Sequence, residues 1–256
     1  MRKLVAGILI TIAALLAAAP AGAITNGSTD GNRHPEVGAM LAQQARSDGT
    51  WTRCTGTLIS QTVFLTAAHC EIPGVSRVNV TFDSAYVYPS GKTYTGTWHA
   101  DPAYSQSQSD PHDIAVIVLD HAIRGITPAQ LPAAGSNDTL PANQQFTSVG
   151  YGTLAAQNGP GGQTFPIDDV RKYAVGTLNS VTASWLRISQ NASHGDGGTC
   201  YGDSGGPNFL GAGSAETNII AATTITGDTA CRSTNVDYRL DTPSARAFLA
   251  GYVTVP

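Results

Sequence analysis

One serine stands in a setting that suits a nucleophile. Ser204 lies in the run GDSGGP at 202–207, shortly after Cys200. A serine hydroxyl reacts poorly unless a base takes its proton and N–H groups stabilise the oxyanion that forms. Glycines let the backbone turn sharply enough to present those N–H groups to a substrate. If the chain supplies no base, the same run predicts only a polar surface turn.

His69 and Asp113 are the candidates for the base and for the acid that orients it. His69 follows an expected strand at 63–67, and small neighbours leave its ring room to face a cleft. Asp113 precedes the apolar run 114–119, and a carboxylate at the head of a buried strand needs a donor such as an imidazole N–H. Taken singly, His69 could be a structural histidine and Asp113 a strand cap. Their order with Ser204 favours a catalytic site.

The other five histidines are not assigned to this site. His112 and His121 are rival bases, but neither has a comparable local setting. His34, His99 and His194 fall in polar loops and are expected at the surface.

The elements that must position these residues are short β-strands separated by Gly and Pro. Expected strands lie at 37–42, 51–59, 63–67, 78–82, 94–98 and 114–119, and then at 145–151, 170–178, 185–189, 207–210, 218–226 and 235–240. A mobile glycine-rich loop is expected at 152–166, and a helix at 243–252. Two blocks of short strands predict an all-β protein of two barrels or sandwiches.

The N-terminal segment has the features of a secretion signal. Residues 1–23 combine a basic start, an apolar run and a small-residue cleavage site after Ala23. A membrane anchor is the alternative, but the apolar run is short for a membrane span. We therefore expect a secreted protein, extracellular or periplasmic. In that oxidising compartment, four cysteines can form two disulfides by any of three connectivities.

Composition argues against several classes of function. The chain has 256 residues, a net charge of −4 and no basic run, which disfavours nucleic-acid binding. No cysteine or histidine spacing is typical of a metal site, so we expect neither a metal nor a cofactor. No second apolar run of spanning length follows residues 1–23, so no membrane association is expected once the signal is cleaved.

Three segments in this order identify a family resemblance. TAAHC at 66–70, DIAV at 113–116 and GDSGGP at 202–207 resemble the signature blocks of the chymotrypsin/trypsin-like serine proteases. The resemblance covers 24–256 and points to a secreted, bacterial-type member acting as a monomer on proteins or peptides, with protein inhibitors as further partners. It implies two antiparallel six-stranded Greek-key β-barrels and a C-terminal helix. The implied parts are 1–23 signal peptide, 24–127 first barrel, 128–141 linker, 142–241 second barrel and 242–256 helix and tail.

The resemblance also implies catalytic roles. Ser204 would be the nucleophile, His69 the general base and then acid, and Asp113 the group that orients the imidazole. The N–H groups of Gly202 and Ser204 would form the oxyanion hole. The implied disulfides are Cys54–Cys70 and Cys200–Cys231.

Activation in the resembled family uses a freed apolar N-terminus, which inserts beside the acid that precedes the serine. Here these residues would be Ile24 and Asp203. Because no propeptide separates Ala23 from Ile24, we expect signal cleavage itself to release the activating amine. The alternative is that Ile24 merely begins the mature chain and that activity is maintained in another way.

By family position, Gly198 would form the base of the primary specificity pocket, and Gly227 and Val236 its walls. Gly198 carries no charge and Val236 would narrow the pocket, so cleavage after small or medium apolar residues is expected. Asp196 and Asp237 lie nearby, and a one-residue shift in alignment would bring a charge into the pocket.

The chain departs from the family at 225–227, where Ile-Thr-Gly replaces Ser-Trp-Gly. This departure keeps an inactive, protease-like binding protein as the main alternative, and a secreted esterase as a second one. The run at 202–206 also fits the G-x-S-x-G pattern of α/β-hydrolases, but no histidine follows Ser204 as that fold requires. A subtilisin-like order would need an acid before His69; Asp30 and Asp48 lie there, in polar turns without a supporting pattern.

Overall fold

The computed structural model describes residues 24–154, 157–160 and 162–256, so the expected signal peptide at 1–23 lies outside the described residues. Six strands form a first closed antiparallel barrel. In barrel order they are β2 (Val37–Leu41), β3 (Thr52–Ser60), β4 (Val63–Thr66), β7 (Ala115–Leu119), β6 (Tyr94–Ala100) and β5 (Arg77–Thr81). The barrel closes because β2 pairs with both β3 and β5.

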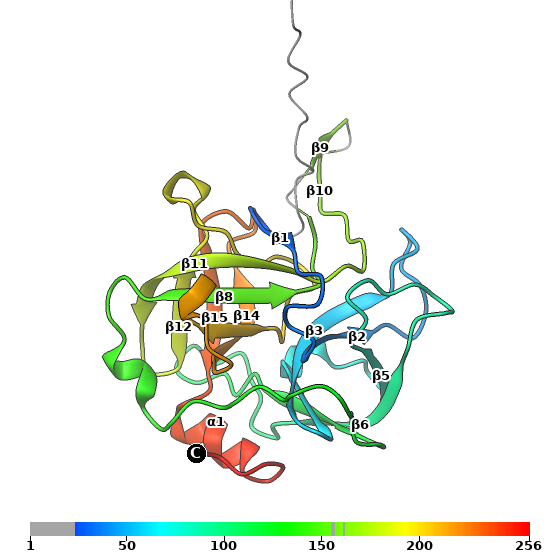
Figure 1. Cartoon of the computed structure of the whole chain (residues 1–256), viewed down its shortest axis with the longest axis horizontal. Helices are drawn as coiled ribbons and strands as arrows, with labels where there is room; N and C mark the ends of the chain where they lie inside the picture. The colour runs from blue at the N-terminus through cyan, green and yellow to red at the C-terminus, as the bar shows by residue number, and fades with distance from the viewer. Residues whose placement is uncertain (1–23, 155–156, 161) are drawn as a thin grey trace, which may run out of the picture.

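Six further strands form a second closed barrel beside the first (Figure 1). In order they are β8 (Gln145–Gly150), β11 (Lys172–Val181), β12 (Trp185–Ser189), β15 (Thr234–Arg239), β14 (Ile220–Gly227) and β13 (Pro207–Leu210). Closure follows because β8 pairs with both β13 and β11. The predicted pair of six-stranded barrels is confirmed.

The largest apolar cluster joins both barrels and the C-terminal helix. It includes Leu65 and Ile114 from the first barrel, Phe209 and Tyr238 from the second, and Leu249 from the helix, all fully buried or nearly so. Burial of side chains of this size stabilises the fold by roughly 1.5–3 kcal/mol each. This cluster therefore packs the two barrels and the helix against one another.

The C-terminal helix α1 (Pro243–Leu249) is confirmed, but it ends earlier than predicted. The Thr242 side chain caps it by accepting a bond from the Ala245 N–H at 3.3 Å, and Pro243 takes the first turn, where it loses no helical bond. Figure 1 shows α1 at the foot of the second barrel. Within the described residues, no helix is long and apolar enough to cross a membrane.

Short elements complete the fold. They are β1 (Ser28–Thr29), β9 (Gln157–Gly159), β10 (Gly162–Thr164), and the 3₁₀ helices η1 (Ala68–Cys70), η2 (Ser136–Thr139), η3 (Ala192–His194) and η4 (Gly213–Ala215). The glycine-rich loop expected at 152–166 contains the hairpin β9–β10, which the sequence did not indicate.

The N-terminal residues lie on the second barrel, although they precede the first. β1 pairs with β11, and Thr25 forms a β-bridge with Gly198. In the expected linker at 128–141, Gln130 bridges to Ile219 next to β14. The domain boundaries at 127 and 141 stay predictions.

Two histidines expected in polar surface loops lie elsewhere. His99 is on β6 and only partly exposed, with its ring 5.5 Å from that of Tyr252. His34 is buried rather than exposed. It is only 4% exposed, and both ring nitrogens meet carboxylates. Nδ1 contacts Asp30, and Nε2 lies 2.6 Å from Glu216 Oε1. Asp30 in turn binds the fully buried Arg171 guanidinium at 2.8 Å. The polar turn that contains Asp30 and His34 is therefore buried by two charged partners from distant parts of the chain, Glu216 and Arg171.

Candidate active site

The 3₁₀ helix η1, which follows β4, presents His69 to Asp113 through two hydrogen bonds. The His69 backbone N–H donates to Asp113 Oδ1 at 2.9 Å, and Nδ1 lies 2.8 Å from Asp113 Oδ2. Asp113 is 4% exposed, whereas the His69 side chain keeps 30% of its surface exposed. A carboxylate at Nδ1 fixes the ring and its tautomer, so Nε2 is left free to accept a proton from another group.

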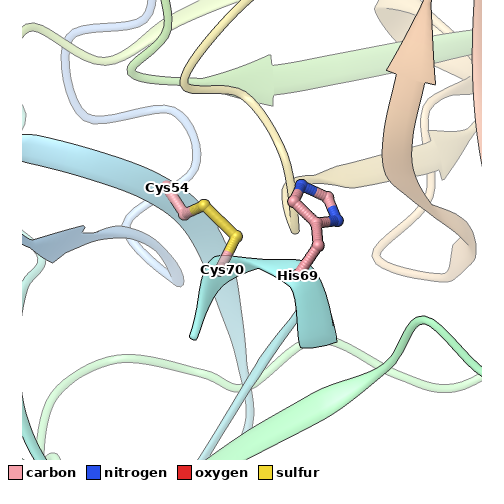
Figure 2. A group of neighbouring side chains, drawn as sticks. All are labelled: Cys54, His69 and Cys70. Atoms are coloured by element: carbon pink, nitrogen blue, oxygen red, sulfur yellow. A yellow bond between two sulfur atoms is a disulfide. The ribbon is translucent and has the colours of Figure 1, made fainter. Parts of the chain in front are cut away.

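A disulfide lies beside His69 (Figure 2). Cys54 on β3 and Cys70 on η1 are joined, as expected, with their Cα atoms 6.2 Å apart. Both sulfurs lie within 4.8 Å of a nitrogen of His69, an arrangement that resembles a metal site. Because metal ligation needs free thiolates and these sulfurs are bonded to each other, the group serves to tie η1 to the barrel.

Ser204 lies in a tight turn that requires glycine at positions 202 and 205. Gly202 and Gly205 have φ of 96° and 83°, in the region that disfavours side chains. A Cβ on Gly205 would meet Thr66 Oγ1 at 2.1 Å. The turn is also tied to the first barrel, because the Thr55 N–H donates to the Ser204 carbonyl at 2.9 Å.

The N–H groups of this turn divide into two sets. Those of Asp203, Gly205 and Gly206 donate to backbone carbonyls at 2.7–3.1 Å. Those of Gly202 and Ser204 have no acceptor within the described part of the chain. Two unpaired donors beside a serine hydroxyl are what an oxyanion hole requires.

Asp203 points away from this turn into the protein. It is fully buried, and its carboxylate accepts bonds from the N–H groups of Gly152 and Cys200 at 2.7 and 2.8 Å. Burial raises the pKa of Asp203 to about 7, although both N–H groups oppose this shift. Ile24 is also fully buried, and its backbone N–H donates to the Thr153 carbonyl at 3.3 Å. Ile24 thus binds Thr153, and the neighbouring residue Gly152 binds Asp203.

A cavity of about 420 Å³ is lined by both His69 and Ser204. Its lining also includes Thr199, Cys200, Tyr201, Gly202, Thr224, Ile225, Thr226, Gly227, Asp228, Thr229 and Cys231. The second expected disulfide, Cys200–Cys231, joins two of its walls. His69, Ser204, Gly202 and Gly227 thus line one cavity, and Asp113 joins them from behind through its bonds to His69.

Two residues expected to form the specificity pocket lie outside the lining of this cavity. Val236 is on β15, paired with Thr226 and Arg187. Gly198 lies beneath the side chain of Gln190.

Neither of the two nearby acids lines the cavity. Asp196 accepts a bond from the Thr177 hydroxyl at 2.8 Å. Asp237 is fully buried in the second barrel, bonded to Asn208 Nδ2 at 2.8 Å, and burial raises its pKa to about 8.

Sequence reasoning missed three residues around the cavity. Asp228 and Tyr201 line it, and Tyr201 donates its hydroxyl to the Thr229 carbonyl at 3.2 Å. Gln190 contacts Asp228 but does not line the cavity. Tyr201 directly precedes the run at 202–207, whereas Gln190 and Asp228 reach the site only through the fold.

The comparisons with known proteins agree with this site. A family model described as "Trypsin" matches residues 28–248. Among curated proteins, trypsin of Phaedon cochleariae is 30% identical over 169 residues, covering 60% of this chain and 63% of the relative, which is less than two thirds of its length. Alkaline trypsin C of Manduca sexta is 30% identical over 215 residues, covering 76% and 80%, and tryptase of Mus musculus is 27% identical over 229 residues, covering 81% and 82%.

Among solved structures, a mutant of human heparin binding protein superposes with a TM-score of 0.66 at 16% identity, covering 88% of this chain and 94% of that one. This likeness shows the fold alone. Fold, site and family model together define the class: the chain belongs to the trypsin family of serine proteases. The curated relatives named here are from animals, so they lend no support to the expected bacterial-type membership, which stays a prediction.

Proposed function

We propose that this protein is a secreted serine endopeptidase with Ser204 as nucleophile, His69 as general base and then acid, and Asp113 as the group that orients His69. The observation that carries the proposal is the two-point bond between Asp113 and His69, with Ser204 in the same cavity. An inactive scaffold has no need of an imidazole held by a carboxylate at Nδ1 in a cavity that a serine also lines.

The reaction is acyl transfer followed by hydrolysis. Ser204 Oγ attacks the peptide carbonyl carbon while its proton passes to His69 Nε2. The N–H groups of Gly202 and Ser204 stabilise the oxyanion. The C–N bond then breaks, and the amine leaves with the proton from His69. Water attacks the acyl-enzyme, His69 takes a proton from it, and the C–Oγ bond breaks as Ser204 regains its proton.

The proposed substrates are proteins or peptides with a small or medium apolar residue before the scissile bond. In support, Gly198 contributes no charge. The Asp228 carboxylate, the one acid of the described lining, is bonded to N–H groups of its own loop. We further propose a monomer that protein inhibitors can bind and that needs no cofactor, nucleic acid or membrane.

The proposed activation step is release of the Ile24 amine by signal cleavage after Ala23. The α-amino group, with a pKa of about 8, would pair with Asp203 and lower the raised pKa of that carboxyl. Burial of Ile24 beside the residues that bind Asp203 supports this step. N-terminal sequencing of the active secreted protein tests it: a start at any other residue contradicts the proposal.

Turnover of chromogenic substrates tests the function. We expect the secreted protein to hydrolyse both a peptide anilide and the matching ester, and Ser204→Ala to hydrolyse neither. Hydrolysis of the ester alone would indicate a dedicated esterase. No hydrolysis of either by folded protein starting at Ile24 would indicate an inactive binding protein.

A further inference from the structure

Gln190 is a buried side chain next to the residues that line the cavity. It follows β12, its backbone N–H donates to the Ser233 carbonyl at 3.0 Å, and it is fully buried. A Cβ placed on Gly198 would lie 2.3 Å from Gln190 Oε1 and 2.6 Å from Gln190 Cβ. The side chain therefore occupies the space into which any side chain at position 198 would project.

Gln190 adjoins the lining of the cavity without belonging to it. Thr199, which follows Gly198, and Asp228 both line the cavity, whereas Gly198 and Gln190 do not. Gln190 Nε2 lies 3.2 Å from Asp228 Oδ1. The amide thus contacts one lining residue, Asp228, and covers Gly198, the expected base of the pocket.

Asp228 holds the amide in this place. Its carboxylate accepts the N–H groups of Ser233 and Thr234 at 2.8 and 2.9 Å, and that of Arg232 at 3.1 Å. Burial raises the pKa of Asp228, but these N–H groups and the Gln190 amide outweigh that effect, so its pKa is below the usual range. An ionised Asp228 keeps the Gln190 amide anchored throughout the neutral pH range.

The amide oxygen of Gln190 lacks the hydrogen bond that a buried oxygen normally makes. Gln190 Oε1 is buried without a hydrogen-bond partner among the described residues. A buried acceptor left unpaired destabilises the fold. The chain keeps a glutamine there in spite of this cost, which points to a role for its bulk.

We propose that Gln190 closes the base of the substrate pocket and restricts the residue before the scissile bond to a small aliphatic side chain such as that of alanine or valine. The inference rests on the proposed peptidase function and deepens it. The depth of the pocket is set by a side chain from the neighbouring strand end, since Gly198 itself contributes none. Removing that side chain joins the space above Gly198 to the cavity.

The test compares peptide anilides that differ only in the residue before the scissile bond: alanine, valine, leucine, phenylalanine or lysine. We expect the unmodified protein to prefer alanine and valine. Gln190→Ala should raise the ratio of kcat/KM for phenylalanine to that for alanine by about ten- to a hundredfold, the range expected for a change in pocket volume. The matched control is Gln43→Ala at an exposed glutamine, which should leave the ratio unchanged.

Because both values of the ratio come from one preparation, the fraction of folded enzyme cancels. If Gln190→Ala does not fold, Gln190→Asn keeps the amide, shortens the side chain and should shift the ratio in the same direction. A ratio unchanged by these variants overturns the inference. So does a preference of the unmodified protein for phenylalanine, or a preference for lysine that Asp228→Asn removes.

Labelling of Ser204 by a fluorophosphonate separates this result from failure of the proposed function. A labelled enzyme with an unchanged ratio overturns the role of Gln190 alone. A protein that is neither labelled nor active overturns both the proposed peptidase function and the role of Gln190.

Discussion

At the scale of single residues, His69 is the histidine for which we propose a catalytic role, because of its contact with Asp113 and its place on the cavity. His112 also contacts a carboxylate, with Nδ1 3.0 Å from Asp101 Oδ2, but His112 does not line the cavity. His69 alone among the described histidines combines a carboxylate at Nδ1 with a place on the cavity that contains Ser204.

Asp113→Asn should therefore leave the fold intact and lower kcat by about 10⁴-fold, since an amide can hold the imidazole in the wrong tautomer. Single-turnover and steady-state rates on one apolar substrate measure the loss. Asp120→Asn, at an exposed carboxylate paired with Arg77, is the control and should keep full activity. A decrease of less than tenfold in Asp113→Asn would contradict the role of Asp113.

Sequence reasoning could name the three residues of the proposed triad because each lies in a contiguous motif. It did not reach Gln190 or Asp228, since their roles depend on a contact between a strand end and a loop 38 residues away. His34 was misjudged for the same reason: Asp30 is close in sequence, but Glu216 is 182 residues away.

At the scale of elements, the N-terminal segment 24–36 is fixed to the second barrel at several points. β1 pairs with β11, Thr25 bridges to Gly198, and His34 links Asp30 to Glu216. The His34 ring also stacks on Phe209 at 5.4 Å between centroids. This segment leads to Ile24, so its attachment bears on the proposed activation step.

His34 should make that attachment depend on pH. Burial lowers its pKa, but bonds to Asp30 and Glu216 outweigh burial and raise it. Arg33 and Arg171 pair with Glu216 and Asp30, the two carboxylates that bind the ring, and Glu36 interacts with the charge of His34. A raised pKa in the folded state means that the stabilisation is fully present below about pH 6.5 and is lost as pH rises through the folded-state pKa.

His34→Gln should thus lower the free energy of unfolding by about 1–3 kcal/mol at pH 6, and by less at pH 9. Urea unfolding at both pH values measures this difference. His121→Gln, at an exposed histidine, is the control and should change neither value. An equal loss at both pH values would show that the charge on His34 contributes nothing.

Much of the element pattern was predictable. Strands with clear alternation, such as β5 with its exposed Arg77 and buried Val78, lie close to where they were expected. The helix was found from its cap and apolar spacing, but its end was not, because Ala250 and Gly251 leave the helix in a short turn. The hairpin β9–β10 escaped prediction because glycine-rich segments give no periodic signal.

At the scale of the whole molecule, the cavity lies where two barrels meet and is shaped by contacts between them. Thr55 of the first barrel donates its N–H to Ser204 and its hydroxyl to the Gly202 carbonyl at 3.0 Å. The Cys200–Cys231 disulfide then holds the Ser204 turn to the opposite wall.

Replacing Cys200 and Cys231 together by serine should lower stability by about 3–4 kcal/mol, given the 31-residue separation. KM should rise more than kcat falls, because the change loosens a binding wall and leaves the Asp113–His69 pair in place. Thermal unfolding and steady-state kinetics measure the two effects. The double serine variant at Cys54 and Cys70 is the contrast, since it loosens η1 and should lower kcat. The same kinetic pattern in both variants would contradict these separate roles.

The central claim is that Ser204 is an activated nucleophile in the secreted chain. The measurement is the intact mass of the secreted protein before and after a fluorophosphonate, with Ser204→Ala treated in parallel. We predict a starting mass for a chain from Ile24 with two disulfides, one adduct, and no adduct in Ser204→Ala. Folded protein of that mass that takes up no probe, or an adduct that persists in Ser204→Ala, would contradict the account.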